Sequence, residues 1–133
     1  EMNNIPVVKT IYDPCPVGFS VPTNGAFSAF TSDGKSTGSM NVNGTNNTAT
    51  YNAQSGHIFW TNRNKNATIY FPASGFREAS NGNISKFNEF GDYWSADPQD
   101  YNNGCCMGFS VTGVSPLHVN LRTYGFAVRP VSE

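Results

Sequence analysis

The stretch CCMGFSVTG, residues 105–113, alternates in polarity: the odd-numbered positions up to Val111 are apolar, and the even-numbered positions are small or polar. Side chains of a β-strand point alternately to opposite faces, so this period of two predicts a strand with one buried face. The same parity predicts that Cys105 is a small core residue, and that Cys106 lies on the polar face as the most reactive thiol of the chain.

The period of two recurs along the chain in short runs that Gly, Asn, Asp and Pro separate. Further strands are expected in IPVVKTIY (5–12), SMNV (39–42), TATYNA (48–53), HIFW (57–60), ATIYFP (67–72), LHVNL (117–121) and GFAVRPV (125–131), and Tyr93–Trp94 are expected on a central strand. Residues 32–56 are so rich in Ser, Thr, Asn and Gly that we expect a loosely packed hairpin or a long loop.

One stretch departs from this period. In PTNGAFSAFTSDG, residues 22–34, Thr23 or Asn24 can cap a short helix over 24–31 that places Phe27 and Phe30 on one face. The sequence therefore predicts an α+β fold, with mostly antiparallel strands and one or two short helices, and with 1–133 as a single domain. The alternating runs at 5–12 and 124–131 are expected to place both termini on neighbouring strands.

Neutral polar and aromatic residues, rather than charges, dominate the composition. The formal net charge is −1, only 13% of the residues are charged, and Lys and Arg form no cluster, which argues against a nucleic-acid partner. The 17 Asn, 13 Gly and 18 aromatic residues suit a surface that hydrogen-bonds neutral polar groups and stacks on apolar faces. We expect this composition in an exported protein that is extracellular or at the cell surface, on the outer membrane.

No run approaches the roughly 20 apolar residues that span a bilayer, and the opening EMNNIPVVKT lacks the order of a signal peptide. We therefore expect the chain to be the C-terminal part of a longer exported precursor. Residues 1–11 would then be a leading strand or linker, and any membrane anchor would lie upstream.

The number and spacing of the cysteines limit their chemistry. The three cysteines cannot all pair within one chain, and no C-x2-4-C spacing predicts a zinc site. Cys15 is interpreted as a buried thiol under a proline turn, with a bridge to Cys105 or Cys106 as the alternative. No histidine lies near Cys15 in the sequence to serve as a base, and the sequence gives no separation for a pair of glycosidase carboxylates. No catalytic residue, metal ligand or cofactor is predicted.

Four motifs occur in order along the chain: DPCPVGFSVPT (13–23), FPASGFRE (71–78), YWSA (93–96) and RTYGFAVRPV (122–131). Together they resemble the "major paralogous domain" of surface lipoproteins and fimbrillin-associated proteins of Bacteroidetes. This resemblance implies a C-type-lectin-like fold. Many members carry a cysteine where Pro130 stands here, which would bridge to the cysteine of the DPCP turn, so the resemblance supplies no partner for Cys15 at that position.

A candidate ligand site lies in SADPQDYNNG, residues 95–104, which is longer than a tight hairpin requires. Recognition residues tend to lie in loops on a rigid scaffold, and the resemblance implies binding through long loops on one side. In this segment Tyr101 offers a stacking face, and Trp60 at the end of HIFW would complete the platform. The remaining predicted site residues, whose side chains can bond sugar hydroxyls, are Asp97, Asp100, Asn102 and Asn103.

The same oxygen atoms could instead bind calcium, or the segment could be a solvated turn. The function expected from these features is that of a non-enzymatic extracellular binding or adhesion module, whose partner is a glycan or a host or bacterial surface protein. The alternative is a structural or fimbrial-tip assembly domain that has no small-molecule ligand.

Overall fold

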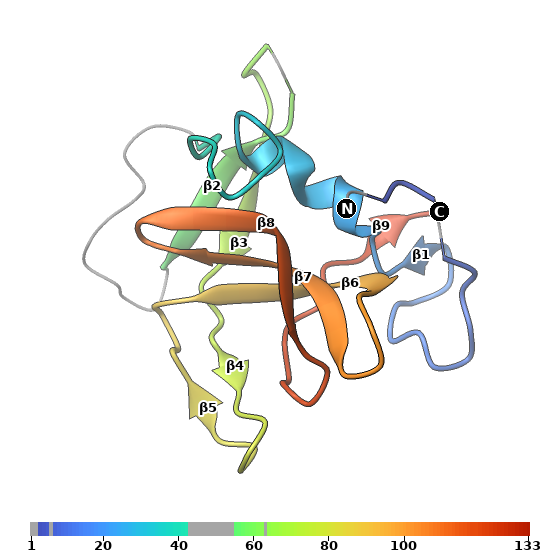
Figure 1. Cartoon of the computed structure of the whole chain (residues 1–133). Helices are drawn as coiled ribbons and strands as arrows, with labels where there is room; N and C mark the ends of the chain where they lie inside the picture. The colour runs from blue at the N-terminus through green and yellow to red at the C-terminus, as the bar shows by residue number, and fades with distance from the viewer. Residues whose placement is uncertain (1–2, 6, 43–54, 63) are drawn as a thin grey trace.

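The computed structural model describes residues 3–5, 7–42, 55–62 and 64–133. Its centre is an antiparallel sheet in the order β6-β7-β8, formed by β6 (Gly91–Pro98), β7 (Asn103–Ser110) and β8 (Gly113–Leu121) (Figure 1). This arrangement confirms the strands predicted around CCMGFSV and LHVNL, and the described part of the chain consists mostly of antiparallel strands.

Three smaller antiparallel pairs surround the sheet. In the described residues, β2 (Gly56–Trp60) pairs with β3 (Thr68–Pro72), which confirms the strands expected in HIFW and ATIYFP. The two-residue strands β4 (Phe76–Arg77) and β5 (Ile84–Ser85) form a second pair. The third pair is β1 (Phe19–Ser20) with β9 (Val131–Ser132).

The predicted helix is present as a 3-10 helix, η1 (Asn24–Phe30). Thr23 is its N-cap, but the Thr23 side chain makes no capping hydrogen bond. The backbone N–H of Asn24 instead donates to Asp97 of β6, at 2.6 Å. The start of η1 is therefore held by a residue distant in the sequence rather than by a local cap.

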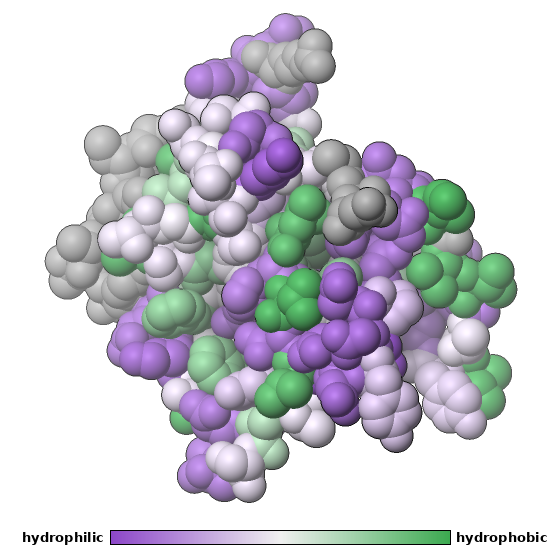
Figure 2. All heavy atoms as spheres, viewed as in Figure 1, coloured by the Kyte–Doolittle hydropathy of each residue, from purple (hydrophilic) through white to green (hydrophobic). Residues whose placement is uncertain are grey.

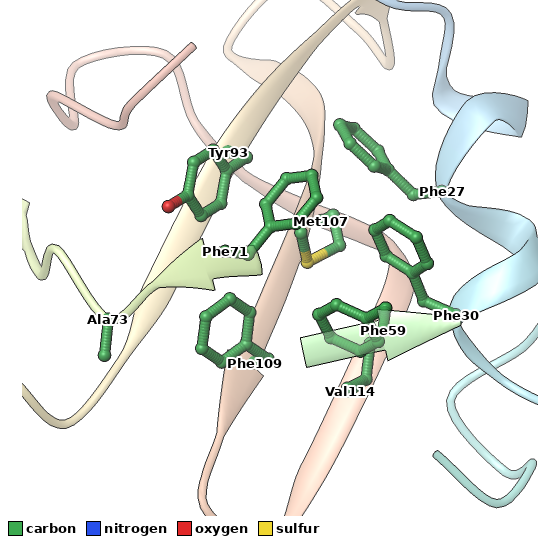
Figure 3. Close-up of a cluster of buried hydrophobic side chains, with 9 residues drawn as sticks. All are labelled: Phe27, Phe30, Phe59, Phe71, Ala73, Tyr93, Met107, Phe109 and Val114. Atoms are coloured by element: carbon green, nitrogen blue, oxygen red, sulfur yellow. The ribbon is translucent and has the colours of Figure 1, made fainter. Parts of the chain in front are cut away.

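The core lies between the three-stranded sheet, the β2–β3 hairpin and η1 (Figure 3). Phe27 and Phe30 project from η1 into this core, as predicted, and Phe30 stacks on Phe59 of β2 with 4.2 Å between ring centroids. Phe71 of β3 meets Tyr93 of β6 edge to face at 4.9 Å. Together with Phe109 of β7, the buried aromatic rings of five elements form one cluster, and their burial is the main apolar contribution to stability.

The C-terminal segment runs beside β6 before it reaches β9. The Trp94 N–H donates to the Ala127 carbonyl at 2.9 Å, and the Ala127 N–H donates to the Asp92 carbonyl at 3.0 Å. Tyr93 and Trp94 therefore have backbone partners on both sides, which agrees with the expected central position. GFAVRPV is not one continuous strand, because beyond its single bridges only Val131 belongs to a strand.

The strand predicted at 5–12 is wrong. Its described residues form no strand, and Val8 and Ile11 are exposed, because the C-terminal strand β9 pairs with β1 instead. The expected pairing of the two ends thus occurs further along the chain, at Phe19–Ser20. Of the other predicted strands, SMNV contributes only single bridges at Met40 and Val42, and TATYNA lies outside the described residues.

The prediction for Cys106 is also wrong. Cys105 is buried as expected, but Cys106 is buried as well, with an exposed fraction of 0%. Cys106 is the register partner of Trp94, whose indole stacks on Phe126 at 4.5 Å, so the second face of the sheet is covered as well. Burial raises the pKa of the Cys106 thiol to about 12, which opposes the reactivity that we predicted.

Cys15 is a buried free thiol under the proline turn, as interpreted from the sequence, and the alternative bridges to Cys105 and Cys106 are not formed. The Lys9 ammonium donates to the carbonyls of Cys15, Pro16 and Phe19 at 3.0, 2.7 and 2.5 Å. Gly18 closes the turn with a φ of 81°, a conformation that favours glycine. The turn is therefore a structural corner that brings β1 to β9.

Within the described residues, no helix has the length and apolar character needed to cross a membrane.

Candidate functional site

The structure divides the predicted site into three places. Asp97 belongs to β6 and is buried, and its carboxylate accepts hydrogen bonds from the Asn24 N–H and from the Asn3 side-chain amide. These contacts join β6 to the start of η1 and to the N-terminal segment. The Asp97 side chain therefore links these parts of the fold, and it also lines a pocket of about 400 Å³.

The expected ten-residue loop at 95–104 is a short connection. Residues 95–98 continue β6 and residues 103–104 begin β7, so only 99–102 lie between the strands. The Asp100 carboxylate accepts the backbone N–H groups of Asn102 and Asn103 at 2.8 and 2.9 Å and the side-chain amide of Asn103 at 2.9 Å. These hydrogen bonds, that of the Asn103 amide first, lower the pKa of Asp100.

Arg122 of the next connection fixes the same turn. Its guanidinium donates to the carbonyls of Asp100 and Asn103 at 2.8 and 3.1 Å. Most polar groups of this turn are thus occupied by the turn itself, while the Tyr101 ring is 92% exposed. The described residues contain no group of three or more Asp, Glu, His or Cys side chains that could hold a metal ion.

Trp60 lies elsewhere, at the end of β2, and Figure 1 shows β2 well separated from the β6–β7 connection. The half-buried indole lines a groove of about 690 Å³, which we call the Trp60 groove. The lining combines one aromatic ring with many hydroxyl and amide groups and comprises Ser28, Ala29, Thr31, Ser32, Gly34, Ser39, Met40, Asn41, Trp60, Thr61, Asn62 and Lys65. The predicted platform of Trp60 beside Tyr101 is not formed.

Asn41 builds the floor of the Trp60 groove by joining η1 to β2. Its N–H donates to the Phe30 carbonyl at 2.8 Å, and its carbonyl accepts the Trp60 N–H at 3.0 Å. Its side-chain amide donates to the carbonyls of Ala29 and Trp60, at 2.9 and 3.3 Å. The position of the Trp60 backbone is therefore fixed on both strand edges, by β3 and by Asn41.

The charge of the groove bears on its chemistry. Lys65 is the one charged residue among the lining residues that the structure describes, and none of them is a carboxylate. A glycosidase uses a pair of carboxyl groups that flank the bond to be cleaved, and this lining does not provide one. The described lining offers an aromatic face and neutral hydrogen-bonding groups.

Sequence reasoning identified Trp60 but missed the other residues of the groove. Asn41 and Asn62 come from the segments on either side of β2, and their only signal was the abundance of Asn and Ser around a tryptophan. No local spacing indicates that Ser28 and Ser32, at the end of η1, meet them. That juxtaposition depends on the docking of η1 against the β2–β3 hairpin.

Comparison with known proteins gives one match. A family model described as a domain of unknown function, DUF8237, matches residues 37–131. No curated protein matches the chain, and no solved structure matches it either. The matched range includes Trp60 and the second half of the Trp60 groove.

Proposed function

Because the chain belongs to the domain family DUF8237, whose description names no activity, we propose a function from the Trp60 groove: the domain is a non-enzymatic extracellular module that binds neutral carbohydrate. The observation that carries the proposal is the composition of the groove, one indole face among hydroxyl and amide groups. Sugars present apolar C–H faces and hydroxyl edges, which an aromatic ring and neutral polar side chains complement.

The wider proposal is a surface adhesion module of the C-type-lectin-like kind, similar to the major paralogous domain of Bacteroidetes, located at the outer-membrane surface. The contacts of the fourth motif support it. Val131 of this motif pairs with Ser20 of the first motif, Gly125 bridges to Arg77 of the second, and Ala127 bridges to Tyr93 of the third. Contacts among the four motifs are expected if the motifs together form one scaffold. They are not expected if each motif matches by chance.

A glycan array tests the carbohydrate proposal, with the fluorescently labelled domain applied as wild type, Trp60→Ala and Tyr101→Ala. We expect the wild type to bind a subset of neutral glycans and Trp60→Ala to lose about tenfold or more in affinity, which corresponds to about 1.4 kcal/mol of stacking. Tyr101→Ala is the matched control, since it removes an exposed ring far from the groove and should bind as the wild type does.

Two results would contradict this assignment. Loss of binding in Tyr101→Ala with full binding in Trp60→Ala would move the site to the β6–β7 connection. A wild-type domain that binds no glycan would favour the alternative function, assembly.

One observation favours that alternative, an assembly domain without a small ligand. Apolar side chains gather on the outside of the N-terminal segment and the β1 corner, where Ile11 and Val17 are 91% and 96% exposed. Figure 2 shows several apolar residues in green at the right-hand edge, over the part of the chain that is blue in Figure 1. Exposed apolar groups that lie together mark contact surfaces for other proteins. Association in sedimentation velocity that Ile11→Ser and Val17→Ser abolish would support assembly.

A further inference from the structure

Asp92 is a buried carboxylate on the side of the sheet opposite the aromatic core. Tyr93 points into the core, so the neighbouring Asp92 points away from it, and its exposed fraction is 6%. Its register partner on β7 is Gly108. A Cβ at Gly108 would lie 2.9 Å from Asp92 Oδ1 and 3.6 Å from His118 Cδ2, so the missing side chain leaves room for both groups above β7.

Within the described part of the chain, no donor forms a hydrogen bond to the Asp92 carboxylate. Burial raises its pKa to about 6, and no hydrogen bond offsets that effect. A buried charge without a partner costs considerable free energy, and proteins usually pair such a charge. Asp92 is nevertheless mostly ionised at neutral pH.

The titratable groups that face Asp92 do not compensate its charge. On β8, partial desolvation lowers the pKa of His118, although its side chain is exposed, and this favours the neutral imidazole at neutral pH. On β7, the Cys106 thiol is protonated because burial, with a contribution from Asp92, raises its pKa to about 12. The cluster of Asp92, His118 and Cys106 therefore carries a net charge of about −1.

This charge lies in a pocket of about 310 Å³, the Asp92 pocket, which shares no lining residue with the Trp60 groove. Besides Asp92 and His118, its lining includes Ser36, Phe90, Ser110 and Ser115. The ring of Phe90 already attracts one cation, since Lys86 Nζ lies 5.8 Å from its centroid. That ammonium is paired with Glu89 at 3.2 Å and is not the partner of Asp92.

We propose that the Asp92 pocket binds a primary ammonium group carried on a small organic molecule or side chain. The Asp92 carboxylate accepts a hydrogen bond from the ammonium group, and the serine hydroxyls of the lining accept its remaining N–H groups. The Phe90 ring lies beside the cation. An organic cation fits better than a metal ion, because Asp92, His118 and Cys106 are not arranged to hold a metal ion together, nor is any other group of three such side chains in the described residues. This site goes beyond the carbohydrate groove and does not depend on it.

An ammonium group can come from a lysine side chain of a partner protein or from an amino sugar, and the two sources can be tested side by side. The ¹⁵N-labelled domain is titrated at pH 7.5 with Nα-acetyl-lysine amide and with glucosamine. The matched neutral probes are Nα,Nε-diacetyl-lysine amide and N-acetylglucosamine. We expect saturable shifts of the Gly108, Ser110 and Ser115 amides with at least one amine and none with the neutral probes, and the amine that binds more tightly identifies the source.

Asp92→Asn keeps the shape of the side chain and removes the charge, so it should abolish these shifts, whereas Asp100→Asn in the β6–β7 turn should leave them unchanged. In the wild type, binding should weaken about tenfold between pH 7.5 and pH 5 as Asp92 becomes protonated; this second measurement needs no variant. Equal shifts with the neutral probes, full binding by Asp92→Asn, or no saturable shift with either amine would overturn the proposal.

Discussion

Individual residues show where the alternating pattern fails as a guide to exposure. Parity placed Cys105 in the core correctly, but it placed Cys106 in water, because the pattern cannot tell that Trp94 and Phe126 cover the second face. The burial of Asp92 could not be predicted for the same reason, because a carboxylate in GDYW has the pattern of the polar residue of a half-exposed strand. The identity of a residue limits its chemistry, but its burial depends on what the rest of the chain places above it.

Replacing Asp92 by Asn should stabilise the fold at pH 7.5 by about 2–3 kcal/mol, since a shift of about two pKa units corresponds to that free energy. The pKa of Asp92 is raised to about 6 from its ordinary value of 3.8, so the folded state binds the proton more tightly. The stability of the wild type therefore rises as the pH falls from above 6 towards 4, and the advantage of Asn shrinks over that interval.

Urea unfolding of both proteins at pH 7.5 and at pH 4.5 measures this effect. His57 and His118 titrate in both proteins, so the difference between the proteins isolates Asp92. An advantage of Asn that is the same at both pH values would show that the carboxylate has a partner in solution.

Strands were predictable where one of their faces packs against the core. They were not predictable where the sequence had to indicate which other strand they pair with. HIFW, ATIYFP and CCMGFSV alternate and are strands because their apolar sides meet the same cluster. IPVVKTIY alternates equally well but is not a strand, since β9 pairs with β1 instead. The connection after β6 was overestimated because residues 95–98 extend that strand, across a register irregularity between Trp94 and Pro98. The candidate site was the least predictable part, since Trp60 and the other lining residues of the groove meet only because η1 docks against the β2–β3 hairpin.

The attachment of η1 to β6 through Asp97 gives the prediction at this scale. Asp97→Ala removes the acceptor of the Asn24 N–H and of the Asn3 amide, and should destabilise the fold by about 2–3 kcal/mol. Asp100→Ala, in an exposed turn, is the matched control and should cost about 1 kcal/mol or less. Guanidinium unfolding followed by circular dichroism measures both. Equal losses for the two variants would mean that η1 is held by its phenylalanines alone.

The whole molecule is organised around a sheet that carries aromatic residues on both faces. On one face lies the core of Phe27, Phe30 and Phe59 with their neighbours, and on the other Trp94 packs with Phe126. The composition predicted a domain rich in strands and aromatic residues. It did not indicate that the C-terminal segment would pass beside β6 and supply the second cluster, because that contact joins residues more than thirty positions apart.

The two tryptophans report on different parts of this arrangement, Trp60 on the groove and Trp94 on the second cluster. If 1–133 is a single cooperative domain, Trp60→Phe and Trp94→Phe should each show a fluorescence transition in urea that coincides with the transition seen by far-UV circular dichroism. A fluorescence transition at lower urea for either tryptophan would reveal a part of the molecule that unfolds on its own.

The burial of all three unpaired thiols has a consequence for the way the protein is made. In an oxidising compartment, the thiols of an unfolded chain are exposed and can form disulfides with other chains. Folding buries the thiols and prevents this reaction. If the chain folds in such a compartment, the yield of protein without cross-links depends on whether folding is faster than oxidation of the thiols. Covalent dimers would accumulate if folding is slow, if the temperature is low or if unfolded chains are crowded. A chain that has already folded would not form such dimers, even without a reductant.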